Sequence, residues 1–150
     1  MKPFLRAEPG TAPDYRMPIE VFYEDTDLSG VVYHANYLKY FERARTRWVR
    51  SLGLDQQRML EDYHLAFTVA DLKIRFVRPV QLEQELEATL AVTLRRGAQM
   101  RFHQCLQAPG DSTKLFAEAD VRVACFDTRS HRPVALPTEL MHPRSGELPE

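Results

Sequence analysis

A short acidic turn and a histidine lie close together in the first third of the sequence. The turn, residues 24–30 (EDTDLSG), carries Asp25 and Asp27, and His34 follows at the expected start of a helix. The first backbone N–H groups of a helix have no partner within it, so together with the helix dipole they favour negative charge. A hydrolytic or acyl-transfer centre needs an anionic nucleophile or general base beside such donors. This stretch supplies both within ten residues.

Each of these residues also has a structural interpretation. A short acidic residue before a helix usually caps it, and we expect Asp25 to do so. For Asp27 the spacing alone leaves catalysis and structure equally open, and an isolated histidine such as His34 more often has a structural role. Residues 25–30 match the first half of a calcium loop, but its twelfth position is Asn36 rather than a bidentate glutamate. Calcium binding is a minor alternative, and no metal site is expected.

Two further groups of side chains have an ordinary and a functional interpretation. Arg95 and Arg96 fall at an expected hairpin tip, where arginines are ordinarily surface charges, although adjacent guanidiniums can also hold a phosphate. His103 and Cys105 can share a strand face as a base and a thiol. No residue nearby is expected to orient the base, so we expect no chemistry there.

Length and composition describe ordinary globular material. The chain has 150 residues, enough for one domain, with 44% hydrophobic and 27% charged residues. Its net charge of -1 argues against a nucleic-acid partner held by bulk electrostatics. The N-terminus lacks the apolar stretch of a signal peptide or membrane span, and Cys105 and Cys125 lack Cys-x-x-Cys spacing. We expect a cytoplasmic protein with reduced thiols, no membrane span, and flexible tails at 1–16 and 141–150 around a domain at 17–140.

The chemistry-bearing turn is expected to join a strand to one long helix. Alternating apolar and acidic residues predict a strand over 19–24. The helix is expected to begin near residues 33–36 and to end at Gly53. Three- and four-residue steps predict its inward stripe. The stripe comprises Leu38, Phe41, Ala44, Arg45, Trp48 and Leu52.

The rest of the chain predicts a second short helix followed by strands. Asp55 is expected to cap a helix that runs to about residue 62. Strands are expected over 65–77, with a bulge near residues 70–71, and then over 82–94, 100–106 and 115–126, before a short helix at 138–141. Glu83, Glu85 and Glu87 alternate with apolar residues, which predicts a solvated strand face. Strands clustered after one helix indicate an α+β protein with an antiparallel sheet.

Three stretches of the sequence closely resemble a known motif. They are residues 23–27 (YEDTD), 30–37 (GVVYHANY) and 41–46 (FERART). Together they resemble the hotdog-fold acyl-CoA thioesterases, in particular the Tol-Pal-associated YbgC-type branch and its relative 4-hydroxybenzoyl-CoA thioesterase. The resemblance continues more weakly to Pro137 and so spans about residues 18–137.

The resemblance implies a fold, an assembly and an activity. The fold would be a hotdog, a five-stranded antiparallel sheet wrapped around one long central helix. The protein would be a homodimer or homotetramer with active sites where two chains meet. It would hydrolyse an acyl-CoA, or a thioester of acyl carrier protein, without metal or organic cofactor, since coenzyme A is part of the substrate. The alternative is a binding or scaffold protein of the same fold that holds these thioesters without turnover.

The resemblance also assigns roles to residues. Asp27 would be the catalytic carboxylate, as nucleophile or general base, with Tyr23 and His34 as supporting residues and the backbone N–H of His34 polarising the thioester carbonyl. The other expected substrate-binding residues follow from the motif, the strand near residues 67–70 and the basic hairpin. They are Gly30, Val31, Tyr33, Thr68, Val69, Arg95 and Arg96. The two arginines would meet the nucleotide end of coenzyme A.

Overall fold

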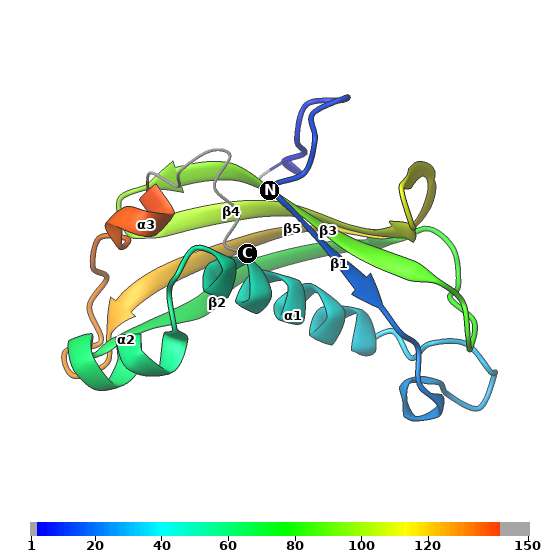
Figure 1. The fold of residues 1–150 in the computed structure, drawn as a ribbon, viewed down its shortest axis with the longest axis horizontal. Helices are drawn as coiled ribbons and strands as arrows, with labels where there is room; N and C mark the ends of the chain where they lie inside the picture. The colour runs from blue at the N-terminus through cyan, green and yellow to red at the C-terminus, as the bar shows by residue number, and fades with distance from the viewer. Residues whose placement is uncertain (1–2, 142–150) are drawn as a thin grey trace.

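The structure, a computed structural model, describes residues 3–141 (Figure 1). Its strands are β1 (Tyr15–Ile19), β2 (Leu65–Phe76), β3 (Leu86–Arg96), β4 (Gln99–Ala108) and β5 (Asp111–Asp127). Its helices are α1 (Asn36–Ser51), α2 (Gln56–Tyr63) and α3 (Thr138–Met141), with a 3-10 turn at Tyr23–Asp25.

The strands form one antiparallel sheet in the order β1-β3-β4-β5-β2. Figure 1 shows α1 running across one face of this curved sheet, with α2 and α3 toward one end. The predicted α+β hotdog architecture, five antiparallel strands around one long helix, is confirmed. Among the described residues, β2 pairs only with β5, so one edge of this strand of 12 residues has no partner.

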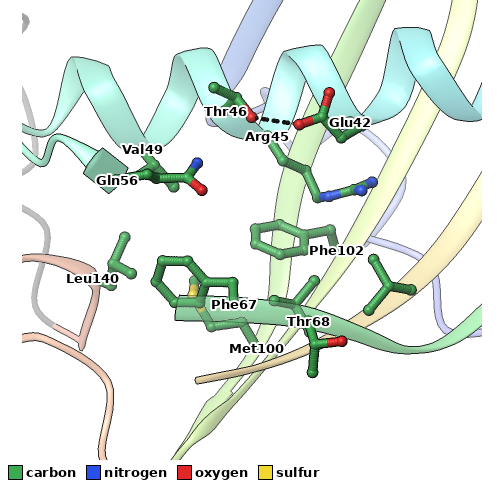
Figure 2. A pocket seen from close by; sticks show the side chains of 12 residues that line it. Glu42, Arg45, Thr46, Val49, Gln56, Phe67, Thr68, Met100, Phe102 and Leu140 are labelled. Atoms are coloured by element: carbon green, nitrogen blue, oxygen red, sulfur yellow. Dashed lines mark hydrogen bonds between the residues drawn. The ribbon is translucent and has the colours of Figure 1, made fainter. Parts of the chain in front are cut away.

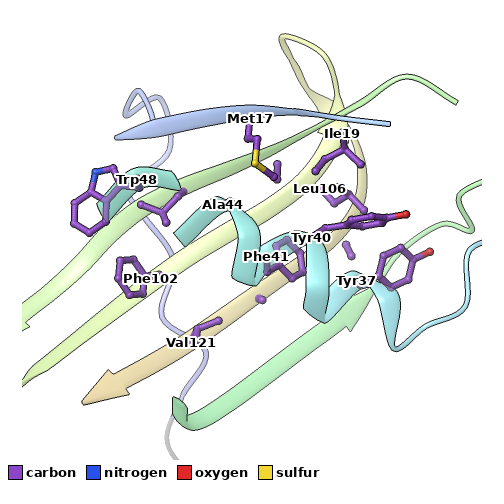
Figure 3. Packing of buried hydrophobic residues seen from close by; sticks show 14 of the residues in the cluster. Met17, Ile19, Tyr37, Tyr40, Phe41, Ala44, Trp48, Phe102, Leu106 and Val121 are labelled. Atoms are coloured by element: carbon purple, nitrogen blue, oxygen red, sulfur yellow. The ribbon is translucent and has the colours of Figure 1, made fainter. Parts of the chain in front are cut away.

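The hydrophobic core lies between α1 and the inner face of the sheet (Figure 3). The helix buries Tyr37, Tyr40, Phe41, Ala44, Trp48 and Val49. The Trp48 and Phe102 rings meet edge to face with centroids 5.7 Å apart. The predicted stripe is right for Phe41, Ala44 and Trp48 but wrong for Leu38, which is 40% exposed. Tyr37 and Tyr40 are buried on the inward side of the helix instead.

Local signals located the helix ends correctly. α1 closes with Gly53 at a φ of 86°, the left-handed conformation that favours glycine. Asp55 caps α2, because its Oδ1 accepts hydrogen bonds from the backbone N–H groups of Gln57 (2.9 Å) and Arg58 (3.4 Å). Both features were expected and are confirmed.

The first strand lies earlier than expected. The sequence predicts a strand over 19–24, but β1 ends at Ile19 and the chain turns at Tyr23–Asp25. Pro18 sits inside β1 opposite Glu87, which an edge strand tolerates because the missing N–H faces no neighbour. The strand's start lies within the segment expected to be a tail, and Leu5 donates its backbone N–H to Asp120 at 2.9 Å. The division into a domain and two tails stays a prediction, and residues 142–150 lie outside the described part.

The prediction that Glu83, Glu85 and Glu87 form one solvated strand face is wrong. Glu83 and Glu85 precede β3, and Glu87 is only 9% exposed. Its Oε1 forms an ion pair with Arg16 at 2.6 Å and accepts a hydrogen bond from Gln107 at 2.9 Å. A buried carboxylate is tolerable when such partners surround it.

The remaining strand features agree with the sequence. The register of β2 against β5 shifts between Val69 and Asp71, which confirms the expected bulge. The basic hairpin joins β3 to β4 through Gly97, whose φ is 60°. Within residues 3–141, no helix has both the length and the apolar sequence that a membrane span needs.

Candidate active site

Asp25 anchors the turn that carries the candidate catalytic residues. Its side chain is buried, and its Oδ2 accepts hydrogen bonds from the backbone N–H of Phe22 and the hydroxyl of Tyr40, both at 2.9 Å. Its carbonyl oxygen accepts from the backbone N–H of Tyr33 (2.8 Å) and the side-chain amide of Asn36 (2.7 Å). Asp25 therefore ties the turn to α1 but does not cap that helix as expected, since its side chain points to Tyr40 instead.

Asp27 is exposed at the outside of the same turn. Its Oδ1 accepts hydrogen bonds from the backbone N–H of Ser29 at 2.8 Å and from the Ser29 hydroxyl. The turn is closed by Gly30 at a φ of 82°, whose N–H donates to the Asp27 carbonyl at 3.0 Å. The Ser29 hydrogen bonds, aided by the nearby charge of His34, lower the pKa of Asp27 from its ordinary value. An ionised carboxylate thus faces solvent beside the start of α1.

The carboxylates of Asp25 and Asp27 do not share a ligand-binding geometry. The first is directed inward to Phe22 and Tyr40, whereas the second is held by Ser29. A calcium loop would need both as ligands of one ion. This arrangement therefore gives no support to the calcium alternative.

His34 lies between two aromatic rings just before α1. Its ring stacks at a tilt on Tyr33, with centroids 4.5 Å apart, and meets the edge of Phe76 at 6.3 Å. Phe76 is the last residue of β2, so these contacts place His34 near the end of the unpaired edge strand.

The start of α1 has free backbone donors. No side chain caps the helix at Ala35, and among the described residues the N–H groups of His34 and Ala35 have no acceptor. The following N–H groups donate to carbonyls three residues back, beginning with Asn36 to Tyr33 at 2.8 Å. The free N–H of His34, expected to polarise a carbonyl, is thus available to a ligand.

The single chain does not bring every predicted site residue to this place. Tyr23 is 83% exposed in the 3-10 turn, and its hydroxyl has no hydrogen bond within the described part of the chain. Val31 lies beside Asp27, because its carbonyl accepts the Asp27 N–H at 3.0 Å. Thr68 and Val69 lie instead near the opposite end of β2 from Phe76.

Thr68 and Val69 line a cavity between the helices and the sheet (Figure 2). Its volume is about 130 Å³, and most of its wall is apolar. The sequence interpretation missed one member of this wall, Arg45, which it placed in the apolar stripe without a role. A charged residue at an inward helical position was the available signal.

The two hairpin arginines have different surroundings. Arg95 is partly buried, and its Nε donates to the Leu140 carbonyl of α3 at 2.8 Å. Arg96 is exposed at the end of β3 and lines a shallow depression with Arg101 and Arg122. Arg101 is paired with Asp120 and Arg122 with Asp71, which leaves Arg96 as the member with no ion pair in the described residues.

His103 and Cys105 do share a strand face, and an orienting group is present after all. The Cys105 sulfur lies 3.6 Å from Nε2 of His103, and that nitrogen lies 3.0 Å from Oε2 of Glu118. Nδ1 of His103 accepts the backbone N–H of Ala7 at 3.2 Å, so the ring proton sits on Nε2, which is then a donor and not a base for the thiol. Burial, together with the charge of Glu118, raises the pKa of Cys105 to about 11. This cluster fastens the N-terminal segment and does not activate a nucleophile.

Comparisons of sequence identify the relatives of this chain. The sequence model of the thioesterase-like superfamily matches residues 21–143. The acyl-CoA thioesterase YbgC of Haemophilus influenzae is 42% identical over 126 residues, which cover 84% of this chain and 90% of that protein. The acyl-CoA thioester hydrolase YbgC of Escherichia coli is 36% identical over 127 residues, which cover 85% of this chain and 92% of that protein.

Solved structures show the same fold. A probable thioesterase from Bartonella henselae superposes with a TM-score of 0.75 at 29% identity, covering 82% of this chain and 98% of that one. The 1,4-dihydroxy-2-naphthoyl-CoA thioesterase Slr0204 from Synechocystis gives a TM-score of 0.78 at 22% identity, covering 85% of this chain and 92% of that one. The likeness read from the motifs around Asp27 and His34 is confirmed, and the chain belongs to the thioesterase-like superfamily.

Proposed function

We propose that this chain is an acyl-CoA thioester hydrolase in which Asp27 drives the reaction at the start of α1. The observation that carries the proposal is the pairing of an exposed carboxylate, whose pKa is lowered, with the free N–H groups of His34 and Ala35. The names of the curated relatives support the same reaction class. The roles of individual residues are proposals that rest on this geometry.

The reaction needs a group that attacks and a site for the charge that develops. The thioester carbonyl oxygen accepts from the N–H of His34 and faces the positive end of the α1 dipole. Asp27 either attacks the carbonyl carbon or takes a proton from an attacking water. If Asp27 attacks, the C–S bond breaks as the thiolate of coenzyme A leaves and takes up a proton from solvent, and a water then hydrolyses the acyl–Asp27 anhydride to the free acid. If Asp27 is the base, the water oxygen becomes part of the acid, the C–S bond breaks, and the proton held by Asp27 passes to the leaving thiolate. His34 orients the substrate through its stacked ring. Tyr23, which is exposed in the single chain, approaches the site when a second copy of the chain covers it.

The complete site is proposed to form when two copies pair along β2. The unpaired edge of β2 carries exposed apolar side chains, with Val69 at 47% and Phe76 at 48%. Such an edge is normally covered or paired. An antiparallel pairing centred near the strand middle, at residue 71 or 72, places Phe76 of one copy opposite residues 66–68 of the other. Because Phe76 touches His34, the cavity of one copy then adjoins Asp27 and His34 of the other.

The remaining partners follow from the same proposal. Arg96 is the arginine of the hairpin that has room for a phosphate of coenzyme A, whereas Arg95 is engaged with α3. Acyl carrier protein as the thiol carrier, a tetramer rather than a dimer, and a cytoplasmic location stay predictions.

Release of free thiol from a panel of acyl-CoAs tests the proposal, with Asp27→Asn as the diagnostic variant. Loss of general-base catalysis typically costs 10²–10⁴-fold in rate, and we expect kcat to fall within that range. Asp27 is exposed, so the melting temperature should stay within a few degrees of the wild type. Asp62→Asn, an exposed carboxylate on α2, is the matched control and should keep full turnover.

The outcome also separates hydrolysis from the binding or scaffold alternative. A scaffold would bind acyl-CoA, raise its own melting temperature with ligand, and release no thiol in either form. Wild-type turnover that Asp27→Asn retains would contradict the mechanism, and absence of turnover in the wild type would contradict the function.

A further inference from the structure

Arg45 reaches from α1 into the cavity between the helix and the sheet. Figure 2 shows its side chain extending toward β4, with the guanidinium beside Phe102. One of its terminal nitrogens, Nη1, donates to Oε1 of Gln104 at 2.9 Å. Gln104 is fully buried, and its Nε2 donates to the Phe41 carbonyl at 2.9 Å, so the amide cannot turn without losing that bond. The fixed amide therefore holds one terminal nitrogen of the guanidinium in the cavity wall.

The charge of Arg45 has no paired carboxylate within residues 3–141. The ion pairs of the described chain do not include it. The nearby acid on the same helix, Glu42, is exposed and accepts from the Thr46 hydroxyl at 2.8 Å. Burial lowers the pKa of Arg45, only partly offset by the charge of Glu42. A guanidinium carries five N–H donors, so most of its hydrogen-bonding capacity remains for a ligand.

The cavity has a size and a lining that suit a short acyl chain. Its volume of about 130 Å³ is close to that of an engineered cavity of roughly 150 Å³ that binds benzene. Apolar atoms of Phe67, Met100, Phe102 and Leu140 form much of its wall (Figure 2). It also reaches Thr68 and Val69, which are exposed on the free edge of β2. The opening therefore lies where a second copy is proposed to bring Asp27.

We propose that this cavity holds the acyl group and that Arg45 selects acyl groups ending in a carboxylate, that is, short dicarboxylic acids bound to coenzyme A through one end. This inference rests on the proposed function. The apolar wall matches the methylene segment, and the planar guanidinium matches a carboxylate through two parallel hydrogen bonds. An unpaired cation in a largely apolar pocket disfavours an acyl chain that ends in a methyl group, because that chain would cover the charge without replacing its water.

A matched pair of substrates tests the selection. Glutaryl-CoA and pentanoyl-CoA have the same number of acyl carbons and differ in whether the distal carbon is a carboxylate or a methyl. We expect wild-type kcat/KM to favour glutaryl-CoA. In Arg45→Met, kcat/KM for glutaryl-CoA should fall roughly 30-fold or more, the effect of truncating one partner of a buried charge pair. The value for pentanoyl-CoA should stay the same or rise, so the preference reverses.

Two further variants control for structure. Arg47→Met removes an exposed arginine from the same helix and should leave both rates unchanged. Arg45→Lys keeps the positive charge without the planar fork, so it should retain part of the glutaryl preference and resolve the matter if Arg45→Met does not fold. Equal losses on both substrates in Arg45→Met, or a wild type that prefers pentanoyl-CoA, would overturn the selection while leaving the hydrolase proposal intact.

Failure of the hydrolase proposal would be seen as absence of thiol release, which is a different result from loss of selectivity. If the wild type releases no thiol from any acyl-CoA, the proposed acyl selectivity is tested by ligand binding alone. Glutaryl-CoA should then raise the melting temperature more than pentanoyl-CoA does, and Arg45→Met should remove the difference. Equal shifts in the wild type would overturn the pocket as well.

Discussion

The hydroxyl of Tyr40 donates a 2.9 Å hydrogen bond to Oδ2 of Asp25 in the interior beneath the turn that carries Asp27. Tyr40 is 1% exposed and Asp25 is 8% exposed. Burial and the Asp25 carboxylate both raise the pKa of Tyr40, so its hydroxyl remains a donor throughout the working pH range. This bond joins the second turn of α1 to the loop that presents Asp27.

Removing that hydroxyl should destabilise the protein. Tyr40→Phe leaves a buried carboxylate with one donor fewer, and hydrogen bonds to charged groups contribute about 1.5–3 kcal/mol. At roughly 2–4 °C per kcal/mol for a domain of this size, we expect the melting temperature to fall by roughly 5–10 °C. Tyr63→Phe, on a side chain 68% exposed, is the control and should melt as the wild type does. An unchanged melting temperature in Tyr40→Phe would show that the bond does not hold the turn.

The hydrogen bonds from Ser29 should set the acid limit of activity. They stabilise the ionised form of Asp27 and lower its pKa, so activity should persist until the pH falls below the ordinary range of an aspartate. Ser29→Ala removes the hydroxyl bond and should move the acid limb of kcat/KM to higher pH. The rate near pH 7 should barely change, since Asp27 stays ionised there. The pH profiles of the two proteins measure this, and an unmoved limb would mean that Asp27 is not the titrating group.

A charge on the free edge of β2 should prevent assembly. The wild type is expected to sediment at twice the chain mass of 17.4 kDa or more. Leu72→Asp places a carboxylate at a position that is 37% exposed on this edge, and two copies would then bring like charges together. We expect a monomer with greatly reduced thioester hydrolysis. Leu60→Asp, at a leucine 46% exposed on α2, should stay assembled and active. A wild type that sediments as a monomer yet hydrolyses thioesters would contradict the proposed pairing.

Glu118 should make the stability of the fold depend on pH in the acid range. Burial raises its pKa, but hydrogen bonds from Arg6, His103 and Arg75 outweigh burial and lower the pKa to about 2 from an ordinary 4.5. A depressed pKa adds stability above the unfolded value, and this stability is lost as the pH falls through the window from about 4.5 to about 2.

Thermal melts across that window test the role of Glu118. In Glu118→Gln the melting temperature at pH 7 should be lower and should change less between pH 5 and pH 2 than in the wild type. Glu61→Gln, on the exposed side of α2, should follow the wild-type curve. Parallel curves for the wild type and Glu118→Gln would show that the cluster does not contribute.

The sequence predicted features whose causes are local. The end of α1 at Gly53, the Asp55 cap and the bulge before Asp71 depend on a few neighbouring residues, and all three are confirmed. Asp27 and His34 could be proposed together because they lie seven positions apart in sequence.

Errors arose where the partner comes from a distant part of the chain. Alternation predicted a solvated Glu87, but this side chain is buried against Arg16, 71 positions away in sequence. Asp25 was expected to cap a helix, and instead its carboxylate accepts a hydrogen bond from Tyr40 on α1. Arg45 was missed as a functional candidate because its proposed role depends on a cavity whose wall includes residues of β2, β4 and α3, all distant in sequence. Neither periodicity nor a motif contains that information.

The four-residue helix α3 forms part of the wall of the proposed acyl cavity through Leu140, and Arg95 of the basic hairpin binds its backbone there. This helix follows the last strand and is separate in sequence from the turn that carries Asp27. Descendants of this chain can therefore diverge in the length of acyl group they accept by altering residues 138–141, while the reaction centre is inherited unchanged.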